Sequence, residues 1–127
     1  PATMTSRPPP EPARSPDDLR DRLRAFAAAR DWDQFHSPKN LAMALIAEAA
    51  ELVEHFQWLT EEQSRALPDG TRAKVADELA DVLVYLVRIA DRLDIDLLAA
   101  TAAKLAQNEA KYPAAKVRGS PRKYSEY

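Results

Sequence analysis

The chain has 127 residues, the size of one domain with a single hydrophobic core. Its formal net charge is -2, from 18 basic and 20 acidic residues. Because no basic stripe covers the folded part, we expect no nucleic-acid partner. The absence of cysteine excludes disulfides, thiolate metal sites and cysteine nucleophiles. No apolar run approaches the roughly 18 residues of a membrane span and no secretory signal is visible, so we expect a cytoplasmic protein with no membrane partner.

Helix start and stop signals divide the chain into elements. Residues 1–14 are rich in proline without hydrophobic periodicity, which predicts a disordered tail. Ser15 and Ser37 each precede a proline, the arrangement expected at a helix start, and an aromatic-rich connector separates the two helices. Pro68 and its neighbours form a turn signal after one possible helical turn, and Pro113 ends the last helix. These signals predict four helices, over 16–30, 38–58, 71–93 and 96–111.

No segment alternates with the period of a strand, so the expected fold class is all-α. We predict a four-helix-bundle-like domain over 15–113, followed by a basic tail over 114–127. The tail either closes over a phosphate chain or stays solvated, and composition leaves both open. The third helix carries apolar residues around much of its circumference, more than three partner helices readily cover. We therefore expect a homo-oligomer that associates through its helices.

Two pairs of carboxylates at helical spacing are the strongest functional signal. Glu48 interrupts an apolar stripe of the second helix, and Glu51 lies three residues on, at its flank. Glu78 and Asp81 repeat this spacing on the third helix. Packing the two helices together would gather four repelling carboxylates, which a divalent cation would stabilise. Oxygen ligands favour Mg²⁺ or Mn²⁺ over Zn²⁺, whereas ordinary solvated acidic faces remain the alternative.

Aromatic and polar residues near these helices are candidates for binding a substrate. Trp32 and Trp58 could stack on a planar base, and His36 could donate or accept a hydrogen bond, although core packing is the alternative for each aromatic ring. Tyr85 follows Asp81 by one turn and could reach a phosphate oxygen. The remaining candidates for substrate binding are Asn108, Lys111, Arg122 and Lys123. With only two glycines there is no phosphate-binding glycine loop, so the fitting reaction is attack of metal-activated water on a phosphoanhydride.

Four segments carry a resemblance to a known family: RDWDQFHSPKNLAMALIAEAAELVEHFQW, DELADVLVYLVRIADRLDIDL, NEAKYP and RKYSEY. Over 17–127 the chain resembles the dCTP pyrophosphatases of the all-α, MazG-like NTP pyrophosphohydrolase superfamily. The resemblance implies catalysis and Mg²⁺ binding by the four carboxylates, with cleavage between the α and β phosphates. It also implies a base pocket of Trp32, His36 and Trp58, with Tyr85 on the phosphate side, in dimers that pair as tetramers. Ala47 stands where the wider superfamily often has a glutamate. The dCTP branch also lacks that glutamate, so its absence favours this branch.

The primary hypothesis is therefore a Mg²⁺-dependent enzyme that hydrolyses dCTP, or 5-modified dCTP, to the monophosphate and pyrophosphate and so cleans the nucleotide pool. One alternative is a pyrophosphohydrolase of broader base specificity. The other is a non-enzymatic helical binding or oligomerisation module whose acidic cluster holds a structural cation.

Overall fold

The computed structural model describes residues 7–121, and the regular structure in that range is entirely helical. The all-α prediction is therefore confirmed. Three elements are short: the 3₁₀ helix η1 (Asp33–Phe35), α3 (Glu61–Arg65) and α6 (Ala114–Val117). The long helices are α1 (Pro16–Ala29), α2 (Pro38–Glu54), α4 (Asp69–Arg92) and α5 (Leu97–Lys111).

Local hydrogen bonds explain where the first two long helices begin. The Ser15 hydroxyl accepts the backbone N–H of Asp18 at 3.0 Å, and the Ser37 hydroxyl accepts that of Asn40 at 3.1 Å. In both cases proline follows the cap and needs no hydrogen-bond partner for its nitrogen. The far end of α2 differs from the prediction, because regular helix stops at Glu54 and turns carry the chain past Trp58.

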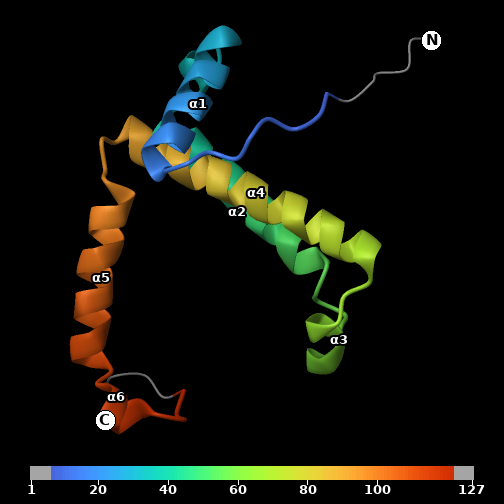
Figure 1. Cartoon of the computed structure of the whole chain (residues 1–127), viewed down its shortest axis with the longest axis vertical. Coiled ribbons are helices and arrows are strands. Elements are labelled where there is room, and N and C mark those ends of the chain that lie inside the picture. The colour runs from blue at the N-terminus through green and yellow to red at the C-terminus, as the bar shows by residue number, and fades with distance from the viewer. Residues whose placement is uncertain (1–6, 122–127) are drawn as a thin grey trace.

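Helices α2 and α4 form an antiparallel pair that is the centre of the fold (Figure 1). His36, just before α2, lies beside Arg88 near the end of α4, while His55, just after α2, lies beside Glu78 in the first half of α4. Leu41 of α2 is fully buried. Helix α1 packs against the second half of α4 and completes a group of three helices.

The apolar face of α4 lies partly outside this group. Leu79 and Leu86 of α4 are 53% and 41% exposed, and Leu93, directly after it, is 50% exposed. The buried apolar residues of the second half of α4 are instead Val87 and Ala90. Within one chain, the second half of α4 therefore packs through the side that carries Val87 and Ala90, and these leucines stay exposed.

Helix α5 extends away from the other three long helices (Figure 1). Its first turn is capped by the Asp96 carboxylate, which accepts the N–H of Ala99 at 3.0 Å. The expected bundle therefore consists, within one chain, of α1, α2 and α4. Helix α6 falls in the segment predicted as a tail. None of the described helices is long and apolar enough to cross a membrane.

Candidate active site

Three carboxylates from the central helix pair meet at one point. Glu48 of α2 faces Glu78 and Asp81 of α4, and one oxygen of each lies within 4.8 Å of the others. The spacing of three residues places Glu78 and Asp81 on neighbouring turns of the same helix face, and the antiparallel packing brings Glu48 opposite them. The sequence predicted that four carboxylates would gather here, and three of them do.

The cluster has the electrostatic character of an ion-binding site. Glu48 Oε2 and Glu78 Oε2 are buried and have no hydrogen-bond partner among the described residues. Burial, then hydrogen bonding to the carboxyls of Glu78 and Glu51, and then the charges of Glu51 and Asp81 raise the pKa of Glu48 to about 7. Unpaired buried oxygens are costly, and a hard divalent cation is the partner that satisfies several at once. These residues therefore fit such a cation.

Two neighbours complete the acidic site. Glu51 is more exposed and lies outside the three-residue cluster, although its carboxyl acts on Glu48. His55 Nε2 lies 3.7 Å from Glu78 Oε1, so it can hold that carboxylate in place. Our sequence analysis missed His55. Its spacing of seven residues from Glu48 puts it on the same helical face, a signal that could have identified it.

A mainly apolar pocket of about 350 Å³ opens beside the acidic cluster. Of the residues proposed from the sequence, Trp32, His36 and Tyr85 line it, as does Asp81. Asp81 thus belongs both to the carboxylate cluster and to the pocket wall. The other lining residues are Leu23, Phe26, Ala27, Val84 and Arg88. A ligand with a flat apolar part and an anionic part can therefore contact both regions at once.

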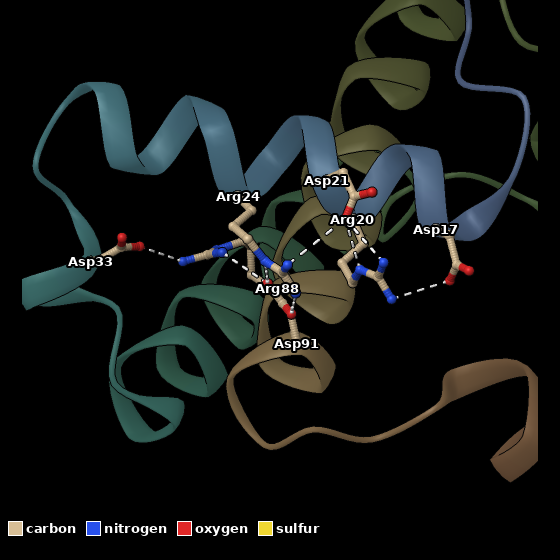
Figure 2. A network of polar contacts seen from close by, with 7 residues as sticks. All are labelled: Asp17, Arg20, Asp21, Arg24, Asp33, Arg88 and Asp91. Carbon is tan, nitrogen blue, oxygen red and sulfur yellow. Dashed lines mark hydrogen bonds and ion pairs between the residues drawn. The ribbon is translucent and has the colours of Figure 1, made fainter.

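A buried arginine closes the far side of this pocket. Arg88 is 3% exposed, and its guanidinium donates to Asp33 Oδ1 at 2.9 Å and to Asp91 Oδ2 at 3.3 Å. Figure 2 shows Arg88 between these two carboxylates, with Arg24 of α1 bound to Asp91 from the other side. The hydrogen bond and charge of Arg24 hold the pKa of Asp91 below its usual value. The sequence analysis did not identify Arg88, although a charged residue on the packing face of α4 is the same kind of signal that singled out Glu48.

His36 joins this ionic group to the pocket. Its Nδ1 lies 3.3 Å from Arg88 Nη2, and its ring is tilted against Trp32 with the centroids 6.3 Å apart. Burial and then the positive charge of Arg88 lower the pKa of His36. The imidazole is therefore held in its uncharged form at neutral pH.

Three more of the proposed residues, Trp58, Asn108 and Lys111, do not line this pocket within one chain. Trp58 is 88% exposed beyond the end of α2. Asn108 and Lys111 lie on α5, which extends away from the site (Figure 1). Arg122 and Lys123 lie outside the described residues. A larger cavity, of about 500 Å³, sits where α1 begins and α4 ends, and none of the residues proposed from the sequence line it.

Known proteins resemble this chain in sequence and structure. Residues 44–127 match the model of the MazG-like family. The dCTP pyrophosphatase 1 of Mus musculus is 46% identical over 112 residues, which are 87% of this chain and 66% of that protein, and that of Homo sapiens is 46% identical over 114 residues with the same coverage. The chain thus spans about two thirds of these relatives. A solved pyrophosphatase from Archaeoglobus fulgidus is 39% identical, with a TM-score of 0.73 over 76% of this chain and 91% of its own.

Proposed function

This chain belongs to the MazG-like family, and we propose that it hydrolyses dCTP to dCMP and pyrophosphate with the help of Mg²⁺. One observation carries the proposal: Asp81 belongs both to the carboxylate cluster and to the wall of the aromatic pocket. A nucleoside triphosphate has the matching form, with a base at one end and a cation-binding phosphate chain at the other. The relatives named dCTP pyrophosphatase 1 support dCTP as the substrate and pyrophosphate as a product.

The carboxylate cluster would act on the phosphate chain. Glu48, Glu78 and Asp81 would hold the cation, and Glu51 would supply a fourth carboxylate beside them. When bound, Mg²⁺ would neutralise phosphate charge and activate the attacking water, and Mn²⁺ would be its closest substitute. His55 would restrain Glu78 through their 3.7 Å contact. Tyr85, one turn after Asp81 and also in the pocket wall, would contact the substrate between base and phosphates.

The aromatic pocket would hold the base. Trp32 offers a broad ring face, and stacking of a base on such a side chain contributes roughly 1 to 3 kcal/mol. His36 offers a polar ring edge in the same pocket. The same pocket would also hold a cytosine that carries a small substituent at position 5. Hydrolysis of such 5-modified dCTP would remove it from the nucleotide pool.

The working enzyme would be a homo-oligomer, such as a tetramer built from two dimers. Few apolar side chains are buried among the described residues, whereas large ones on α2, α4 and α5 are more than half exposed. Such surfaces are normally covered by another copy. Assembly would also give residues remote from the pocket in one chain, Trp58, Asn108 and Lys111, access to a site in another chain. Arg122 and Lys123 of the basic tail would also contact the substrate.

The decisive experiment measures pyrophosphate release from a panel of ribo- and deoxyribonucleoside triphosphates with Mg²⁺, with EDTA as the control. We expect EDTA-sensitive release from dCTP and its 5-modified forms. Similar release from many bases would retain the reaction and refute the cytosine preference. No release from any triphosphate, together with stabilisation by Mg²⁺ but not by a non-hydrolysable nucleotide, would favour the binding module instead.

A further inference from the structure

We propose that Arg88 is a positioning residue that holds His36 as its neutral Nε2–H tautomer, so that the pocket presents one fixed hydrogen-bond donor to an acceptor atom on the edge of the substrate base. This inference rests on the proposed function for the identity of the ligand. The state of His36 itself does not depend on that function and can be measured in the protein alone.

The contact between the two side chains determines the tautomer. Arg88 Nη2 lies 3.3 Å from His36 Nδ1. A guanidinium can only donate hydrogen bonds, so the Nδ1 atom that faces it must accept with its lone pair. The ring proton of a neutral histidine then resides on Nε2. Within the described part of the chain Nε2 has no hydrogen-bond partner, and the residue lines the pocket, so this donor is available to a ligand.

The charges around His36 support the same state. Arg88 and Arg92 both approach it, and Arg92 donates to its backbone oxygen at 3.1 Å. Asp33 is the one opposing charge among the causes that act on the ring, and it is itself bound to Arg88. Burial together with the two arginines outweighs Asp33 and lowers the pKa of His36. A second ring proton would therefore be unfavourable at neutral pH.

Packing alone gives no reason for an arginine at this position. Arg88 is almost fully buried, and its Nε is buried without a partner within residues 7–121. Buried ionic groups commonly stabilise a fold no better than apolar residues of similar size, and an unsatisfied donor lowers the benefit further. The guanidinium does what an apolar residue cannot: it binds Asp33 at the start of η1 and His36 at its end. It thereby fixes the segment that carries Trp32 and His36 into the pocket.

The first test is ¹⁵N NMR of the full chain, which has two histidines, with the His36 signals assigned by their loss in His36→Gln. We expect the Nε2–H tautomer at pH 7. In Arg88→Met the Nδ1–H form should appear, whereas Arg88→Lys, which retains a charged donor, should preserve Nε2–H. Arg24→Met is the matched control, since it removes another arginine of the same ionic group that does not contact His36. A wild-type Nδ1–H or doubly protonated ring would overturn the proposal, as would an unchanged tautomer in a folded Arg88→Met.

The second test separates positioning from general damage by kinetics with dCTP. His36→Gln can place an amide N–H near the former Nε2, whereas His36→Asn can only replace Nδ1. We expect KM to rise roughly tenfold in His36→Asn, the effect of one lost hydrogen bond, and to be partly restored in His36→Gln. Arg88→Met should raise KM more than it lowers kcat, with Arg24→Met unchanged. Equal KM values in the two His36 variants would refute the donor role. If the wild type releases no pyrophosphate, the proposed function fails while the NMR result still decides the tautomer.

Discussion

The two charged regions of α4 obey opposite rules. Around Glu78 and Asp81 the charges are alike, and buried oxygens have no partner within the described residues. Around Arg88 and Asp91, two to three turns further on, positive and negative groups alternate and bind one another (Figure 2). The negative charge of the first region requires a cation from outside the chain to balance it, whereas the positive and negative charges of the second nearly cancel. An incomplete cluster is therefore suited to binding a ligand, whereas a nearly complete one is suited to positioning its neighbours.

The largest expected effect comes from removing one charge of the incomplete region. Glu78→Gln keeps the shape of the side chain but removes a ligand for the cation. Loss of a residue that merely supports a ligand typically costs 10- to 100-fold, so we expect activity to fall by more than about 100-fold, with Mg²⁺ binding lost. Pyrophosphate release, calorimetry with Mg²⁺ and circular dichroism would measure activity, binding and helicity.

Helicity should remain as in the wild type, because the substitution removes repulsion and changes no packing. An active Glu78→Gln enzyme that still binds Mg²⁺ would show that Glu78 is not a ligand of the cation.

Breaking the balanced region should instead affect stability. Arg88→Met leaves Asp33 and the mostly buried Asp91 without their shared partner. Hydrogen bonds to charged groups typically contribute about 1.5 to 3 kcal/mol. We expect a loss of that size in urea unfolding at fixed protein concentration, because Asp91 keeps Arg24 and Asp33 is partly exposed. Glu78→Gln, measured in parallel, should show no such loss. Equal stability of Arg88→Met and wild type would mean that the balanced region contributes little to the fold.

The pocket between the two regions allows a test on the two tryptophans of the chain. Trp32 lines the pocket and Trp58 does not. Loss of a stacking contact worth roughly 1 to 3 kcal/mol should raise KM for dCTP by about 5- to 150-fold in Trp32→Ala, with a smaller change in kcat. The same result for Trp58→Ala would indicate that a second copy brings Trp58 to the site. An unchanged KM in Trp58→Ala would leave it a structural or surface residue.

The incomplete region should also make stability depend on pH when no cation is present. Because the pKa of Glu48 is raised from 4.5 to about 7 in the folded chain, the folded state keeps a proton that the unfolded state loses. This contribution is complete below pH 4.5 and is lost as the pH rises through 7. Thermal melts in EDTA should therefore show lower stability at pH 8 than at pH 5.

Glu48→Gln should flatten that dependence, and Mg²⁺ should restore stability at pH 8 in the wild type only. If the stability of Glu48→Gln depends on pH as strongly as that of the wild type, other titratable groups cause the dependence.

The smallest expected effect lies at the outer edge of the balanced region. Arg24 is about half exposed and binds Asp91, which Arg88 also contacts. Exposed ion pairs usually contribute little, so we expect Arg24→Met to lose the least stability of these variants in urea unfolding, and less still in high salt. A loss as large as that of Arg88→Met would show that the two arginines act as one unit.

Local signals allowed the sequence to determine the helices and the acidic cluster. A serine cap and a following proline act within one turn, so Ser15 and Ser37 fixed where α1 and α2 begin. The spacing of Glu78 and Asp81 likewise fixed their common face. The same reasoning placed the end of α2 too late, because its last residues form turns that no proline or glycine announces.

Only the tertiary structure decided how these elements face one another. It placed Arg88 between Asp33 and Asp91, made Asp81 part of the pocket wall, and turned Leu79 and Leu86 outward. It also directed α5 away from the site (Figure 1). The physical reason is one of range. Caps and helical spacing depend on neighbouring residues, whereas the partner of a side chain depends on the rotation of two packed helices, which is set by all their contacts together.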